Sequence, residues 1–169
     1  MNVRQKLFWN QAKTDWEVYE YLVAASPPKP VCHELHYLQM CTEKLAKAYF
    51  TVPPKSHAAL VDFIYALRSN KKAIAPLGFA DDAELSRWAH SVDPLVQTIE
   101  RLSPDLARRF KTEINPEYPW PKGAEMIAPV DYSFQTEIFD LIDIQKKSGE
   151  QRFFDIFTKM VNTLDQWCQ

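Results

Sequence analysis

The stretch that decides the fold is residues 32–50, which read CHELHYLQMCTEKLAKAYF. Its apolar residues recur at steps of three and four, the spacing of one face of an α-helix. That face consists of Leu35, Leu38, Cys41 or Thr42, Leu45, Ala48 and Tyr49. A second row runs along its border and consists of His36, Gln39, Glu43 and Lys47. Polar groups beside a core need partners, so the stretch predicts a long helix whose polar row has a structural or binding role.

Glycine and proline usage favours helices over hairpins. The chain of 169 residues has only 3 glycines, and its 12 prolines fall in clusters that separate segments. With 46% hydrophobic and 25% charged residues, the composition is that of an ordinary globular domain, and the length fits one domain, residues 1–169. The net charge of −2 supplies no overall attraction for nucleic acid.

Cysteine usage and hydropathy predict a cytoplasmic protein. Cys32, Cys41 and Cys168 form no CxxC pair and no metal-ligand spacing, which favours reduced thiols. The N-terminal residues turn polar before a signal-peptide core develops. No apolar run approaches the roughly 18 residues of a membrane span, so we expect no membrane partner.

Helical periodicity and proline breaks predict the other elements. One helix is expected over residues 4–25, with Phe8, Ala12, Trp16, Tyr19 and Val23 on its buried face. Another is expected from residue 93, with Leu95, Ile99 and Leu102 inward and a kink or restart at Ser103-Pro104. The remaining helices are expected over residues 57–70, 81–92, 132–147 and 150–167. Together they predict an all-α, up-and-down bundle of four to five main helices, with a short extra helix and a loop rich in proline and aromatic residues.

Residues 36–47 carry a family resemblance. They read His36-Tyr37-Leu38-Gln39-Met40-Cys41-Thr42-Glu43-Lys44-Leu45-Ala46-Lys47. This resembles the second helix of the HEPN family (higher eukaryotes and prokaryotes nucleotide-binding domains), which typically carries aromatic-x-x-Gln-x-x-x-Glu-Lys-x-x-Lys. The order and length of the helices are similar as well. Glu117-Tyr118-Pro119-Trp120 and residues 129–134 look like part of a bacterial branch of the family.

The resemblance implies a helical bundle that often pairs as a dimer. Some relatives are metal-independent ribonucleases with an Arg-x(4–6)-His motif. Others lack the motif and serve as partners of minimal nucleotidyltransferases or as antitoxin-like components. By resemblance we expect a homodimeric, non-catalytic binding module for nucleotide or RNA, or for a partner such as a nucleotidyltransferase.

The histidines depart from the ribonuclease motif. None of His33, His36, His57 and His90 follows an arginine by the required spacing. The closest match is Arg87-Trp88-Ala89-His90, which still puts both side chains on one helix face. The alternative prediction is therefore an atypical, toxin-like, metal-independent ribonuclease, in which His90 moves protons and Arg87 stabilises phosphate charge. The other interpretation is a pair of solvated residues on a short polar helix.

The row of His36, Gln39, Glu43 and Lys47 also has two interpretations. It can line a groove that binds a nucleotide or a partner's main chain, or it can bond to neighbouring helices and fix the register of the bundle. Glu43 and Lys47 form an i,i+4 pair worth about 0.3–0.5 kcal/mol when exposed. Glu43 is the residue for which we predict a role beyond packing. A purely structural dimeric protein is the third hypothesis.

Residues 115–131 form the other candidate site. Their prolines exclude a helix and disfavour a strand, and long irregular connections are often functional. Tyr118 and Trp120 could stack on a base while Lys122 contacts a phosphate. The alternative is an aromatic and proline-rich strap that seals one end of the bundle.

The sequence predicts no cofactor and no metal site. Cys32 and His36 share a helix face, but a structural zinc site needs four ligands and no second ligand pair follows. The paired Glu-x-x-His signature of di-iron bundles, a Gly-rich phosphate loop and a nucleophile elbow are all missing from the sequence.

Overall fold

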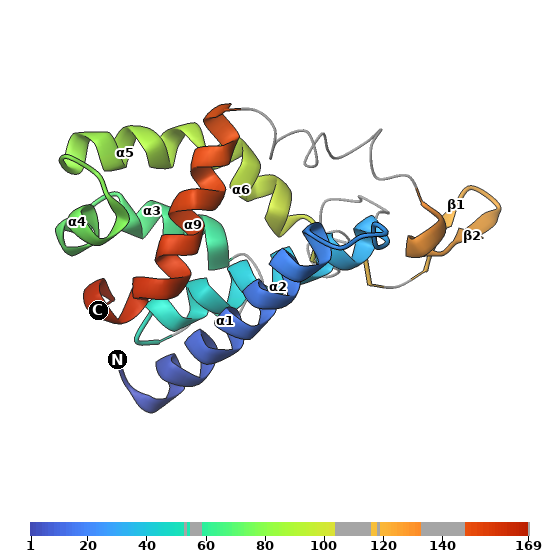
Figure 1. Cartoon of the computed structure of the whole chain (residues 1–169), viewed down its shortest axis with the longest axis horizontal. Helices are drawn as coiled ribbons and strands as arrows, with labels where there is room; N and C mark the ends of the chain where they lie inside the picture. The colour runs from blue at the N-terminus through green and yellow to red at the C-terminus, as the bar shows by residue number, and fades with distance from the viewer. Residues whose placement is uncertain (53, 55–58, 104–115, 118, 133–147, 169) are drawn as a thin grey trace.

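A computed structural model describes residues 1–52, 54, 59–103, 116–117, 119–132 and 148–168 (Figure 1). These residues form an all-α helical bundle with one small β-hairpin, so the predicted fold class is confirmed. Among the described helices, none is both long and apolar enough to cross a membrane.

Helices α1 (Val3–Val23) and α2 (Val31–Tyr49) pack along one another (Figure 1). A capping box starts α1: the Asn2 side chain accepts the Gln5 N–H at 2.9 Å, and the Gln5 side chain accepts the Asn2 N–H at 2.8 Å. The buried face ends in Leu22, whereas Val23, predicted to be inward, is exposed. The reason is that α1 ends at this point, and Leu22, three residues after Tyr19, takes the inward position.

The middle of the chain folds into short helices. They are α3 (Ala59–Leu67), η1 (Lys71–Ala73), α4 (Ile74–Leu77), α5 (Asp82–Ser91) and α6 (Asp93–Glu100). Gly78 ends α4 with a φ of 81°, and the Asp81 side chain caps α5 by accepting the Glu84 N–H at 2.7 Å. Helices η1 and α4 are additional to the prediction. The expected inward residue Leu95 is half-buried, while its neighbour Val96 is buried.

Helix α9 (Ser148–Trp167) completes the core by packing against α1, α4 and η1 (Figure 1). Its inward stripe is the predicted one, and every member has 0% exposure: Phe153, Phe157, Met160, Leu164 and Trp167. The Trp167 ring stacks near Phe63 of α3, with centroids 6.2 Å apart. Burying each large apolar side chain stabilises the fold by about 1.5–3 kcal/mol. The helix predicted over residues 132–147 lies outside the described residues, apart from its first position.

The described part of the loop predicted at residues 115–131 contains a β-hairpin, which corrects the expectation that it has no strand. Strands β1 (Trp120–Lys122) and β2 (Glu125–Ile127) pair antiparallel, with Lys122 opposite Glu125. Gly123 has the positive φ, 65°, that a two-residue hairpin turn requires. A short 3₁₀ turn, η2 (Pro129–Asp131), follows. The hairpin lies on the opposite side of the molecule from α4 and α5 (Figure 1).

Candidate functional site

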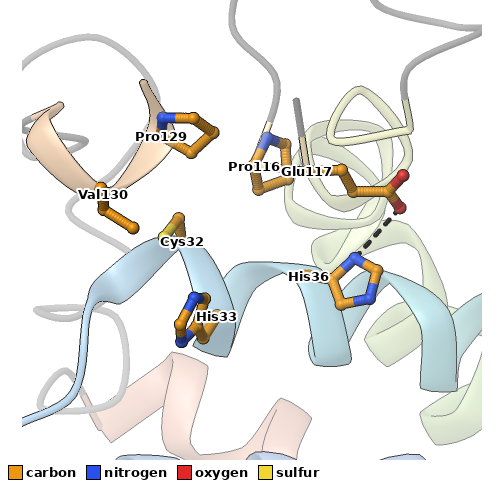
Figure 2. A pocket seen from close by; sticks show the side chains of 7 residues that line it. All are labelled: Cys32, His33, His36, Pro116, Glu117, Pro129 and Val130. Carbon is orange, nitrogen blue, oxygen red and sulfur yellow. Dashed lines mark ion pairs between the residues drawn. The ribbon is translucent and has the colours of Figure 1, made fainter. Parts of the chain in front are cut away.

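A pocket opens beside the N-terminal half of α2, where residues 116–117 and η2 face the helix (Figure 2). Its volume is about 370 Å³. Its lining consists of Cys32, His33, His36, Pro116, Glu117, Pro129 and Val130. Helix α2 contributes a thiol and two imidazoles, and the opposite wall contributes a carboxylate and three apolar side chains. A few polar groups in an otherwise apolar hollow are typical of small-molecule sites.

An imidazole–carboxylate pair forms one wall of this pocket. His36 Nδ1 lies 3.0 Å from Glu117 Oε1, and the two side chains are 30% and 20% exposed. The contact is an ion pair when the imidazole is protonated, and the buried Nδ1 makes no well-aligned hydrogen bond to a described residue. Tyr37 packs edge-on against the His36 ring, with centroids 5.2 Å apart. The pair therefore holds the imidazole in one orientation.

The pocket thiol is not an activated nucleophile. Cys32 is only 1% exposed, and burial raises the pKa of its thiol above the ordinary value. A thiol with a raised pKa stays protonated near neutral pH and is a poor nucleophile and metal ligand. Among the described residues, no cluster of three or more His, Cys, Asp or Glu side chains could hold a metal ion.

The other members of the predicted polar row lie away from this pocket. Gln39 and Glu43 are buried, and the Gln39 side-chain amide donates to Glu43 at 2.9 Å. Lys47 forms an ion pair with the second oxygen of Glu43. The row is therefore divided: His36 faces the pocket, while Gln39, Glu43 and Lys47 bond to one another along α2. These contacts lie within α2 itself, and the role of the three residues stays a prediction.

Glu100 is a buried carboxylate that the sequence reasoning did not single out. It ends α6, and its Oε1 accepts the Val61 N–H in the first turn of α3 at 2.7 Å. Burial raises the pKa of Glu100, and the negative charges of Asp62 and Glu43 add to this effect. A carboxylate from one helix thus caps another helix, an arrangement that no local sequence signal announces.

Lys44, also part of the family-like pattern, ties α2 to α1. Its Nζ lies 3.2 Å from Asp15 Oδ2, and Asp15 is 5% exposed. The thiol of Cys41, one turn earlier, donates to the Ala12 carbonyl at 3.2 Å. Burial raises the pKa of the Cys41 thiol well above its usual range, and the Asp15 charge raises it further. These contacts fix how the two helices align.

No family model matches the chain, and no curated protein or solved structure is found to be similar to it. The HEPN resemblance stays a prediction that rests on the residues quoted for it. In this fold Gln39, Glu43, Lys44 and Lys47 all bond within the helical bundle, so the pattern has a structural explanation here.

The alternative catalytic pair lies on α5, apart from the pocket lining. Arg87 and His90 are both exposed, and His90 Nδ1 lies 2.7 Å from the Ser86 carbonyl one turn earlier. Nearby, Arg152 of α9 forms an ion pair with Glu84. The Ala80 N–H, together with this guanidinium, lowers the pKa of Glu84. Arg152 is therefore already paired with the Glu84 carboxylate.

The aromatic and basic candidates of the loop are only partly described. Tyr118 lies outside the described residues, as do the side chains of Trp120 and Lys122, whose backbones belong to β1. Ile127 and Tyr132 pack against the core, which agrees with the strap interpretation. Glu117 is the residue that the sequence reasoning missed as a site residue. Its signals were its place in the family-like stretch Glu117-Tyr118-Pro119-Trp120 and its position between prolines in a segment already considered functional.

Proposed function

We propose that this protein is a non-catalytic binding module whose ligand is a nucleotide, free or within RNA, with its base in the pocket beside His36 and Glu117. The observation that carries the proposal is the pocket itself. Its volume of about 370 Å³ falls in the range of small-ligand sites, about 300–1,000 Å³. The resemblance of residues 36–47 to HEPN proteins is a separate support from the sequence.

The lining suits a base better than a phosphate. Glu117 accepts hydrogen bonds, and a carboxylate has capacity for several donors, so it can take base N–H groups beside its contact with His36. Imidazole rings provide flat surfaces on which a base stacks. Among the lining residues the ionisable groups are one carboxylate, two imidazoles and a thiol. Guanine, which presents adjacent N1–H and N2–H donors, is the best match to this wall.

The chemistry of the side chains favours binding over catalysis. The Cys32 thiol is buried with a raised pKa, and neither residue of the alternative pair, Arg87 and His90, belongs to the pocket lining. All three cysteines are free, which fits the reducing cytoplasm in which we expect the protein to act.

Calorimetric titration of the four nucleoside monophosphates tests the proposal. We expect guanosine monophosphate to bind most tightly, and Glu117→Gln to weaken it by at least about tenfold, because a hydrogen bond to a charged group contributes about 1.5–3 kcal/mol. Glu125→Gln is the matched control, since Glu125 is exposed on the neighbouring hairpin and outside the pocket lining. Equal weakening by both variants, or no binding of any nucleotide, would contradict the proposal.

Metal-free incubation with RNA separates this proposal from the ribonuclease alternative. We expect no cleavage by the wild-type protein. Cleavage that disappears in His90→Ala, with Ser91→Ala on the same helix as the control, would establish a nuclease site on α5 and overturn the non-catalytic assignment.

A further inference from the structure

Helix α1 presents one side to the core and leaves the opposite side exposed. Its inward residues are Gln5, Ala12, Asp15, Trp16, Tyr19 and Leu22. Its outward residues, all exposed, are Val3, Leu7, Asn10, Thr14, Glu17 and Tyr21. The outward set recurs at alternating steps of four and three, the spacing of a coiled-coil seam. We call these six residues the α1 seam.

The α1 seam is apolar at its two ends and polar in its middle. Val3, Leu7 and Tyr21 are 76%, 65% and 67% exposed, with Val3 and Leu7 one turn apart near the start of α1 and Tyr21 near its end. Helix α1 lies at the edge of the molecule (Figure 1), and none of its residues lines the pocket. The seam is therefore a surface independent of the proposed ligand site.

Charge is distributed unevenly along one flank of the α1 seam. Lys6 is exposed near the N-terminal end of this flank, and Glu17 and Glu20 are exposed near its C-terminal end. Lys13, close to the middle, lies over the Trp9 ring at 3.6 Å from its centroid. The helix thus carries a basic end and an acidic end, and it is complementary to a second copy of itself only when that copy runs in the opposite direction.

We propose that two copies of this chain associate through the α1 seam with their α1 helices antiparallel. The seam residues then pair symmetrically around the midpoint of the seam. Val3 of one copy meets Tyr21 of the other at each end, and Leu7 meets the aliphatic part of Glu17. Asn10 meets Thr14 at the centre, where a polar pair fixes the register. Lys6 of each copy lies beside Glu20 of the other. A parallel arrangement would instead oppose Glu17 to Glu17 and separate the complementary ends.

The size of the surface sets the strength of the association. A helix of 21 residues is roughly 32 Å long at a rise of about 1.5 Å per residue. A single helix pair of that length buries less than the roughly 1,200 Å² of a stable interface. The dimer is therefore a weak, reversible one.

Sedimentation equilibrium across a concentration series tests the surface. We expect the wild-type mass to rise from 19.7 kDa toward twice that value. We expect Leu7→Glu to remain monomeric, because the introduced carboxylate would face the carboxylate of Glu17 in the other copy. Val52→Glu is the matched control, since Val52 is 84% exposed outside α1. A wild type that stays monomeric at every concentration overturns the proposal, as does a Leu7→Glu variant that dimerises like the control.

Charge reversal tests the antiparallel direction. Lys6→Glu and Glu20→Lys are each expected to weaken the dimer by up to about tenfold, because each breaks two exposed pairs per dimer. The double variant is expected to regain wild-type association, since the two charges have exchanged places and opposite charges again face each other across the seam. Positions 6 and 20 are too far apart within one helix to interact. A double variant that associates no better than the single variants rules out the antiparallel arrangement.

Discussion

The two halves of helix α2 use polar side chains in different ways. From the middle of the helix toward its C-terminal end, Gln39, Glu43 and Lys47 are buried or nearly so, and Glu43 bonds to the other two. In the N-terminal half, His36 pairs with Glu117 across a pocket, and both groups keep contact with solvent. The difference lies in what covers the helix: α3 and α6 pack on α2, whereas residues 116–117 and η2 face its N-terminal part. Removing a polar group should therefore affect stability in one half and binding in the other.

The largest expected effect on stability comes from Glu43→Ala. This substitution leaves the Lys47 ammonium without its carboxylate and the Gln39 amide without its acceptor in a mostly buried place. Removing one partner of a buried pair typically costs about 3 kcal/mol, which chemical denaturation would measure as a lower midpoint.

Glu34→Ala is the control for this prediction, since Glu34 is half-buried on the same helix and should cost far less. If Glu43→Ala folded as stably as wild type and lost only ligand binding, the predicted role of Glu43 beyond packing would be correct and the comparison would fail.

A smaller, pH-dependent effect is expected from Glu100. Burial raises its pKa in the folded protein above the ordinary value of 4.5, so the folded state binds the proton more tightly than the unfolded state does. Its contribution to stability is then fully present below pH 4.5 and decreases as the pH rises through the folded-state pKa. Glu100→Gln keeps an oxygen for the Val61 N–H and removes the titration.

Unfolding free energies of wild type and Glu100→Gln, measured from about pH 4 to 8, test this effect. We expect the wild type to lose stability relative to the variant as the pH rises. A difference between them that is constant with pH would show that folding leaves the pKa of Glu100 unchanged, and a change in the opposite direction would show that folding lowers it; either result contradicts the prediction.

The smallest effect on stability is expected from Glu117→Gln. Its ion pair with His36 is partly exposed, and such pairs contribute about 0.5 kcal/mol. Thermal unfolding should therefore change little, although nucleotide binding weakens. A loss as large as that of Glu43→Ala would mean that the pair holds residues 116–117 in place as part of the fold, and the two parts of α2 would not differ as described.

The sequence predicted α2 and α9 well because their buried faces follow helical periodicity without interruption. The hairpin could not be predicted in this way, since each strand has only three residues and β1 contains Pro121. Periodicity needs a longer window than that. Gly123 was the one local signal of a turn, and glycine alone does not specify a hairpin.

The candidate site was only half predictable. His36 was identified because it lies beside an apolar stripe, but its partner Glu117 is distant in the sequence, and no local pattern connects them. The division of the polar row was not predictable either. Whether Glu43 is buried depends on how α3 and α6 pack on α2, and that is decided by tertiary contacts.

The cap that Glu100 provides for α3 has a consequence for the order in which this chain acquires its structure. On the ribosome, the first turn of α3 is made about 40 residues before the carboxylate that satisfies its Val61 N–H. Until α6 has left the exit tunnel and docked, α3 is a short helix whose first turn lacks this acceptor, and such helices are unstable in isolation. Formation of α3 is therefore tied to that of α6, and a chain stalled between them would expose the part of α2 that both helices later cover.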